Sequence, residues 1–318
     1  MSGRRRPAPG STPTGPAGRV APPIPVTVVT DTTHYLPAEV VKAQGIHLVS
    51  LYVNWPDGRQ AREADLDGFD AFYAELRSAS DLPTISQPSL GDFLSVYEPL
   101  LERGEDIVSI HIAGALSGTV AAAKSAREEL VARGIAPERI VVMDSTTTAA
   151  GLGLLALAAS SAARVGASAA EAADVARRCR EGIYVLFAVD TLEFLRRGGR
   201  IGAASAYLGT ALKIKPILTF EAEVTPIARV RTSSRAFEHL VGHLEARRAE
   251  GCDAFMVQHI QAPDQALRMV ERGRSIYGTE PIFVSEIGPV VGTHVGPGLL
   301  GVSGVRRAII GDAFPLGP

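Results

Sequence analysis

The regular alternation of short apolar runs with helical patterns between residues 26 and 163 constrains the fold more than any other feature of this chain. Apolar runs typical of strands lie at 26–30, 46–54, 107–112 and 140–143, and helical patterns lie at 37–44, 68–78, 90–103, 120–133 and 148–163. Strands that alternate with helices over short turns indicate a parallel sheet with helices on both faces. The first half is therefore predicted to be a three-layer α/β/α domain.

The pattern changes from residue 168 onwards. Helical patterns lie at 169–180, 233–248 and 264–276, and strand-like runs lie at 184–189, 213–220, 224–231, 254–260, 282–287 and 299–305. The second and third of these runs are close enough to form a hairpin. The second half thus predicts a two-layer α/β domain with a mixed sheet. We expect a disordered tail rich in Pro and Gly at 1–25, an N-terminal domain at 26–166 and a C-terminal domain at 167–318.

Charge and cysteine usage exclude several classes of function. The net charge of −2 gives no bulk attraction to nucleic acid or to an anionic membrane surface. The uncharged stretch at 146–163 approaches the length of a membrane span, but its apolar residues are largely alanine. We therefore expect a buried helix and no stable membrane insertion. Cys179 and Cys252 are far apart, which argues against a disulfide framework or a zinc site and suits a cytoplasmic protein.

The segment at 113–119 is the clearest candidate for a binding site. It joins the apolar run at 107–112 to a helical pattern. Such a strand–turn–helix unit aims free backbone N–H groups at one point, where an anion binds. Ser117 can donate its hydroxyl to a carboxylate, and Gly118 lets a ligand approach the backbone. The alternative is that Ser117 only caps its own helix.

Residues 84–89 lie between two helical patterns and carry several polar groups. The hydroxyls of Thr84 and Ser86 and the amide of Gln87 can line the mouth of a polar pocket. The alternative is an ordinary helix start, in which Ser89 is the N-cap.

Two later segments place charged or titratable groups in constrained loops. Arg200 lies in a Gly/Arg-rich loop at 196–202, which can hold a phosphate, meet an acidic partner, or be a solvated turn. His294 lies at 288–298, where four glycines and two prolines impose a specific backbone path. A lone histidine is usually structural, but its place in a constrained loop favours a functional role.

Several motifs of enzymes are missing from the sequence. It holds no GxxxxGK[ST] phosphate loop, no GxSxG nucleophile elbow and no HExxH metal pattern. The first strand ends without the glycines that bind dinucleotides. We therefore expect a protein that holds an acidic group rather than one that cuts a bond, with no cofactor.

Taken together, the motifs resemble the DegV-like fatty-acid-binding proteins, the lipid-carrying subunits of bacterial fatty acid kinase. The matching pieces follow one another in the family's order from about residue 26 to 302: Asp31-Thr32-Thr33, Ser86-Gln87-Pro88-Ser89, Leu116-Ser117-Gly118-Thr119, Gly198-Gly199-Arg200-Ile201, Lys213-Ile214-Lys215-Pro216-Ile217, Arg231-Thr232 and His294. Each piece is weak alone, whereas the ordered set is specific.

The resemblance implies two α/β domains with a long-chain fatty acid in an apolar tunnel. The carboxylate of the ligand would meet hydroxyls at the mouth, and the family's carboxylate-binding serine falls on Ser117. A separate kinase subunit would phosphorylate this carboxylate with ATP and give an acyl phosphate for phospholipid synthesis. Arg200 and Arg231 would then form a basic rim for the kinase and its phosphate, with His294 near the head group. The chain itself would be a binding subunit and not an enzyme.

One departure from the family pattern affects the head group. The family's second carboxylate ligand, a threonine, falls on Ile85, which cannot form a hydrogen bond. A carboxylate left short of donors is destabilised by about 1.5–3 kcal/mol. Thr84 or Ser86 takes over through a shifted backbone, or His294 and a water molecule do, or the ligand is not a free fatty acid.

Two rival functions remain open at the level of the sequence. The first is an acyl-transfer or hydrolytic enzyme with Ser117 as nucleophile and His294 as base. The second is a degenerate family member that binds no lipid and acts in regulation. The sequence fixes neither the length and unsaturation of the acyl chain nor the oligomeric state.

Overall fold

The structure is a computed structural model that describes residues 24–207, 214–221 and 223–311. Most of the expected disordered tail at 1–25 therefore lies outside the described residues, as do Lys213 and Ala222. The described chain forms one parallel sheet, one mixed sheet and one small antiparallel sheet.

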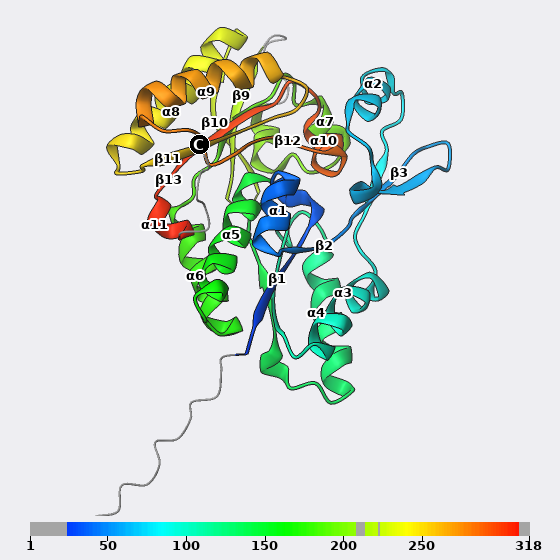
Figure 1. Cartoon of the computed structure of the whole chain (residues 1–318). Helices are drawn as coiled ribbons and strands as arrows, with labels where there is room; N and C mark the ends of the chain where they lie inside the picture. Colours follow the sequence, from blue (N-terminus) through cyan, green and yellow to red (C-terminus); the bar gives the residue numbers. More distant parts are fainter. Residues whose placement is uncertain (1–23, 208–213, 222, 312–318) are drawn as a thin grey trace, which may run out of the picture.

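The first large sheet is parallel and has helices on both faces (Figure 1). Its strands, in the order β2-β1-β6-β7, are β2 (His47–Val49), β1 (Val26–Asp31), β6 (Asp106–His111) and β7 (Ile140–Asp144). Val29 and Ile107 pack against helices α3 (Leu90–Glu102) and α4 (Thr119–Ala132). Val28 and Val108 pack on the other face, against α5 (Ala150–Arg164) and α6 (Ala169–Gly182). Alternate strand residues thus serve two cores, and the prediction of a three-layer α/β/α arrangement is confirmed.

The run at 46–54 is not one strand, and that expectation was wrong. It divides into β2 and β3 (Tyr52–Asn54), and β3 belongs to the small sheet with the order β4-β3-β5. The other strands of this sheet are β4 (Gln60–Arg62) and β5 (Thr84–Ser86), so the polar segment at 84–89 begins with a strand. Ser50 and Leu51, both buried, carry the chain from one sheet to the other. An unbroken apolar run does not reveal such a change of sheet.

The second large sheet is mixed, as predicted. Its strands, in the order β10-β9-β8-β13-β11-β12, are β10 (Val224–Val230), β9 (Lys215–Phe220), β8 (Leu186–Ala188), β13 (Leu300–Val305), β11 (Ala254–His259) and β12 (Val284–Glu286). Only the pair β11–β12 is parallel, and β9 and β10 form the expected hairpin. Helices α8 (Ser233–Ala249) and α9 (Pro263–Tyr277) cover one face of this sheet.

The other described elements are short or lie at the edges of the sheets. They are η1 (Thr32–His34), α1 (Ala38–Gln44), η2 (Glu63–Asp65), α2 (Asp70–Ser78), η3 (Pro137–Arg139), α7 (Glu193–Arg197), η4 (Gly202–Tyr207), α10 (Pro289–Val295) and α11 (Arg307–Ile310).

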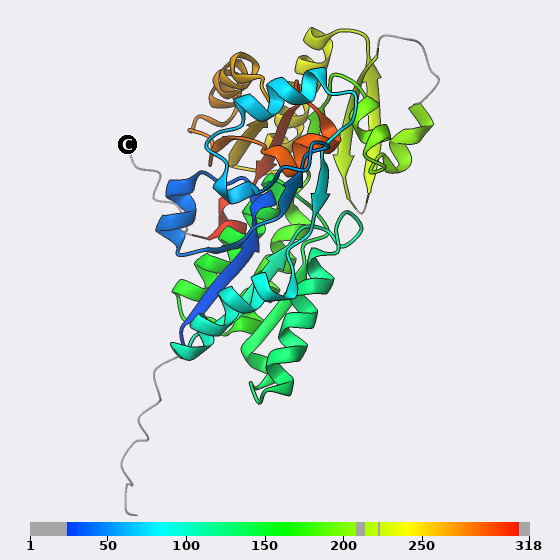
Figure 2. The ribbon, with the colours of Figure 1, turned by 90° about the vertical axis from the view of Figure 1, so that its right-hand side faces the viewer.

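Helix α5 joins the two large sheets. Its residues Leu154 and Leu155 share one core with Ala254 and Met256 of β11, so α5 lies between the sheets (Figures 1 and 2). No helix within the described ranges is long and apolar enough to cross a membrane.

Helix α6 follows the expected domain boundary at residue 166, yet it packs on α5 and on the parallel sheet. The division into domains stays a prediction, and this packing favours a boundary nearer to residue 182.

Candidate functional site

A cavity lies where the three sheets meet. Its volume, taken as the space open to the centre of a water molecule, is about 120 Å³. One water molecule needs ~10–15 Å³ of such space, so the cavity has room for about ten times as much. Its walls come from the turns after β6 and β7, from the inner face of the mixed sheet and from α10. Such a junction between layers is a usual place for a ligand site in α/β proteins.

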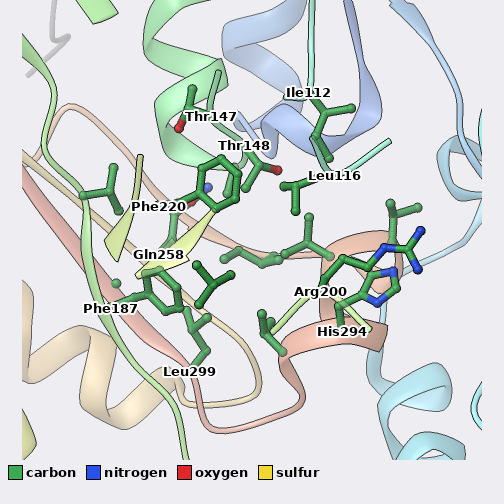
Figure 3. Close-up of a pocket in the computed structure, with 18 of the residues that line it drawn as sticks. Ile112, Leu116, Thr147, Thr148, Phe187, Arg200, Phe220, Gln258, His294 and Leu299 are labelled. Atoms are coloured by element: carbon green, nitrogen blue, oxygen red, sulfur yellow. The ribbon is translucent and has the colours of Figure 1, made fainter. Parts of the chain in front are cut away.

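Most of the cavity wall is apolar, with Arg200 and His294 at one end and with Thr147, Thr148 and Gln258 away from them. Figure 3 shows Arg200 and His294 side by side at one end, with Phe187, Phe220 and Leu299 away from them. The polar side chains among the lining residues are those of Ser117, Thr147, Thr148, Arg200, Gln258 and His294. A pocket with this division suits a ligand that has a long apolar part and a polar head.

Ser117 lines the cavity from the turn that follows β6. Its Oγ lies 2.8 Å from Oγ1 of Thr119, and either hydroxyl can be the donor. Its contact with the backbone N–H of Thr119 is long, at 3.4 Å, and the N-cap of α4 is Gly118. Ser117 is therefore not the N-cap of α4, and its hydroxyl remains available to a ligand.

Gly118 brings two of the sequence motifs together. A Cβ atom at this position would lie 1.9 Å from Oε1 of Gln87, so the turn and the segment at 86–88 touch here. Gly118 itself does not line the cavity. The helix start at Ser89 is confirmed, because its Oγ accepts from the N–H of Asp92 (3.1 Å) and the Asp92 carboxylate accepts from the N–H of Ser89 (2.8 Å).

Ile85 lines the cavity, whereas Thr84 and Ser86 do not. Successive residues of a strand point to opposite faces, so the neighbours of Ile85 on β5 are turned away. Both are exposed, and Oγ of Ser86 accepts from Nδ2 of Asn54 at 2.9 Å. The expectation that Thr84 or Ser86 replaces the missing hydroxyl is therefore not supported, since it requires a one-residue slip of β5.

His294 lies on α10, so the segment expected as an irregular loop contains a helix. The Nδ1 atom of His294 is buried and has no hydrogen-bond partner among the described residues. Burial, with a smaller contribution from the charge of Arg200, lowers the pKa of His294 to about 4. The imidazole is therefore neutral near pH 7, so one ring nitrogen is a hydrogen-bond donor and the other is an acceptor.

The Gly/Arg-rich loop contacts His294 directly. A Cβ atom on Gly198 would lie 2.4 Å from Nδ1 of His294. Arg200 is exposed at the polar end of the cavity, where its Nη1 donates to the carbonyl of Gly198 at 2.9 Å. Arg231, by contrast, is exposed just after β10 and does not line the cavity.

The nucleophile and the base that an acyl-transfer enzyme needs are not joined by a hydrogen bond in this structure. The hydroxyl of Ser117 pairs with Thr119, and among the described residues no hydrogen bond joins Ser117 to His294. Across the same residues, no group of three or more His, Cys, Asp or Glu side chains is placed to hold a metal ion.

A buried chain of hydrogen bonds, not anticipated from the sequence, supports the turn that carries Ser117. Asp31 Oδ2 lies 3.1 Å from His111 Nδ1, His111 Nε2 lies 2.6 Å from Ser109 Oγ, and the hydroxyl of Tyr97 donates to Ser109 at 2.6 Å. Burial alone would raise the pKa of Asp31, but the hydrogen bond and charge of His111 hold it below its usual value. All four side chains are fully buried, so the chain ties β1 to β6 and α3 and does not face a substrate.

A second buried group, Glu63, fixes the start of α10. Its Oε1 accepts from the hydroxyl of Tyr35 (2.9 Å) and from the N–H of Val290 (2.8 Å). Burial raises the pKa of Glu63 to about 7. The hydroxyl of Tyr73 donates to the carbonyl of Ile287 at 2.6 Å. Side chains from the first half of the chain thus position the helix that carries His294.

Comparison with known proteins gives one consistent family. The family model DegV, described as "Uncharacterised protein, DegV family", matches residues 25–307. A DegV domain-containing protein of Streptomyces coelicolor is 40% identical over 281 residues, which cover 87% of this chain and 97% of that protein. Protein DegV of Bacillus subtilis is 32% identical over 282 residues, which cover 87% of this chain and 98% of that protein.

Solved structures agree with this match. A DegV family protein from Thermus thermophilus, whose structure is described as showing fatty acid binding, has a TM-score of 0.78 and 34% identity, over 89% of this chain and 99% of that one. DegV of Bacillus subtilis, described as a fatty acid binding protein, has a TM-score of 0.80 and 30% identity, over 89% of this chain and 100% of that one. The chain belongs to the DegV family.

Proposed function

We propose that this chain is a cytoplasmic carrier that binds one long-chain fatty acid in the cavity. The observation that carries the proposal is one cavity with a largely apolar wall, which Ser117 also lines, and with Arg200 and His294 at one end. The solved DegV proteins of Thermus thermophilus and Bacillus subtilis, both described as binding fatty acid, support it.

The acyl chain would supply most of the binding free energy. Each CH₂ group removed from water contributes about 0.8 kcal/mol. The wall that would receive it includes Ile112, Leu116, Phe187, Phe220 and Leu299. The polar groups would then fix the orientation of the ligand and contribute a smaller share, about 1.5–3 kcal/mol for each hydrogen bond to the carboxylate.

The carboxylate would lie at the polar end. Ser117 offers a hydroxyl, Arg200 offers a charge, and the neutral imidazole of His294 offers a ring N–H. Since His294 lines the cavity whereas Thr84 and Ser86 do not, we favour the explanation in which His294 and a water molecule make up for Ile85.

The same arrangement supports a second step, in which a separate kinase phosphorylates the bound carboxylate. Arg200 and Arg231, the two residues of the expected basic rim, are both exposed, and Arg200 lines the cavity. This basic rim would meet the kinase and the transferred phosphate, because arginine binds phosphate oxygens in a bidentate manner. In this account the chain presents a substrate and performs no bond-making step itself.

Mass spectrometry of natively purified protein tests the proposal. Extraction with organic solvent should release a fatty acid in about equal amount to the protein. The absence of any acyl chain, together with no saturable binding of added fatty acid, would contradict the proposal and favour the degenerate regulatory member. Ester hydrolysis that Ser117→Ala abolishes would instead favour the enzyme.

A further inference from the structure

One position of the mixed sheet carries no side chain where the sheet faces the cavity. Gly301 lies in the interior of β13 and lines the cavity. It pairs with Phe187 of β8 on one side and with Gln258 of β11 on the other, and both of these residues line the cavity too. Residues directly opposite one another in antiparallel strands point to the same face of the sheet. Gly301 therefore leaves a gap in the wall between a phenylalanine and a glutamine.

A side chain added at position 301 would point towards the cavity. A Cβ atom on Gly301 would lie 3.4 Å from Cβ of Phe187 and 3.7 Å from Cδ2 of Leu299, and both of these residues line the cavity. The alternate residues of the strand, Leu300 and Val302, pack in the core under α8 and α9 on the other face. The gap is thus on the side of the sheet where the ligand would lie.

The fold itself does not require a glycine at position 301. Gly301 lies in a regular strand and lacks the positive φ that favours glycine, and an added Cβ would meet its neighbours at ordinary van der Waals distances. Gly304 on the same strand differs, because a Cβ atom there would clash with the hydroxyl of Tyr277. A glycine inside a strand weakens the strand, and it often marks a place where a ligand approaches the backbone closely. At Gly301 the cavity supplies that reason.

Gly301 lies away from the groups that would hold the carboxylate. Figure 3 shows its pairing partners, Phe187 and Gln258, away from the end of the cavity where Arg200 and His294 lie. A fatty acid that places its carboxylate at that end would bring a distal part of its acyl chain to Gly301.

We propose that Gly301 sets the length of the acyl chain that the cavity accepts, because distal carbons of the chain occupy the space that a side chain at this position would fill. This inference rests on the proposed binding of a fatty acid. In a close-packed interior, a side chain and the end of a ligand cannot share one place. Gly301 thus determines specificity for chain length, whereas Ser117 and His294 hold the carboxylate that all the ligands have in common.

Titration with saturated acids of increasing length tests the inference. Delipidated wild-type protein, Gly301→Ala and Gly301→Val are each titrated with decanoic, dodecanoic, tetradecanoic, hexadecanoic and octadecanoic acid. In the wild-type protein the affinity should rise about fourfold for each added CH₂ group until the chain fills the cavity. Gly301→Val should weaken the acid that wild type binds best by about tenfold or more, the loss of about two CH₂ groups, and leave decanoic acid within about twofold. Gly301→Ala should act in the same direction by a smaller factor.

Two controls separate the loss of space from damage to the fold. Urea unfolding should show Gly301→Ala to be at least as stable as wild type, because glycine inside a strand is less favourable than alanine. Gly242 is exposed on α8, which covers the other face of the mixed sheet, so Gly242→Ala should keep the wild-type profile of affinity against chain length.

The inference is overturned if the folded variants of Gly301 keep the wild-type profile, or if they weaken all the acids by the same factor. If Gly301→Val does not fold, the profile of Gly301→Ala decides in the same way. Failure of the wild-type protein to bind any of the acids would overturn the proposed function as well, so the two failures are distinct.

Discussion

Ile85 lies in the cavity wall at the position where the family pattern has a threonine. Ile85→Thr would introduce a hydroxyl there without a change in the pairing of β5. A hydrogen bond to a charged group contributes about 1.5–3 kcal/mol. We therefore expect the variant to bind a long-chain fatty acid at least about tenfold more tightly than wild type, as measured by equilibrium titration.

Thr84→Ala is the matched control for this change. Thr84 is exposed on the same strand and does not line the cavity, so removal of its hydroxyl should leave the affinity unchanged. If Ile85→Thr has no effect on affinity either, the carboxylate does not approach β5, and the proposed orientation of the ligand is wrong.

Glu63 makes the stability of the fold depend on pH. Burial raises its pKa to about 7 from 4.5, so the folded protein holds a proton that the unfolded chain releases. The protonated Glu63 therefore stabilises the folded state fully below pH 4.5, and this stabilisation is lost as the pH rises through 7. The difference amounts to about 3 kcal/mol of unfolding free energy. Glu63→Gln cannot ionise and should become more stable relative to wild type as the pH rises from 5 to 8.

Urea unfolding at several pH values measures this trend. Glu39 is exposed on α1, and Glu39→Gln should follow the wild-type pH profile. Parallel profiles for Glu63→Gln and wild type would mean that Glu63 has an ordinary pKa in the folded protein.

At the scale of elements, the buried chain from Asp31 to Tyr97 connects β1, β6 and α3 below the turn of Ser117. His111→Ala leaves the carboxylate of Asp31 buried without this partner, which should lower the unfolding free energy by about 3–5 kcal/mol. Tyr97→Phe removes only the last hydroxyl and should lower it by about 1 kcal/mol. Equal effects of the two variants in thermal unfolding would contradict a central role for the Asp31–His111 pair.

The elements that the sequence predicted correctly depend on local patterns. The parallel strands and their helices follow from apolar alternation, and the start of α3 follows from Ser89 as the N-cap. The division of 46–54 between two sheets and the strand nature of 84–86 were missed, because both depend on pairing with distant strands. The helix α10 was missed because Gly288 and Pro289 were interpreted as a loop, although proline is also favoured in the first turn of a helix.

The candidate site, too, could be predicted from the sequence only where local motifs mark its residues. Motifs directed attention to Ser117, Arg200 and His294, and the structure places all three around one cavity. Glu63 carries no local signal of importance, since its role comes from burial and from contacts made only in the folded chain. The binding roles of all these residues remain predictions.

At the scale of the whole molecule, the cavity belongs to neither half alone. Its wall combines Leu116 after β6 with Phe187 of the mixed sheet and Val290 of α10, and α10 in turn is held by Glu63 of the first half. A ligand in this place contacts both halves at once. Its binding should therefore stabilise the whole fold, by about 2.7 kcal/mol at a concentration of 100 times Kd.

The central claim is that this one cavity holds one fatty acid by its carboxylate and its chain. The most direct measurement is an equilibrium titration of delipidated protein with a labelled long-chain fatty acid, for wild type and Ser117→Ala. We predict saturation at one ligand per chain for wild type, and about tenfold or greater weakening in the variant, because the carboxylate loses a charge-assisted hydrogen bond. The absence of saturable binding to the wild-type protein, or equal affinity in the two proteins, would contradict the account.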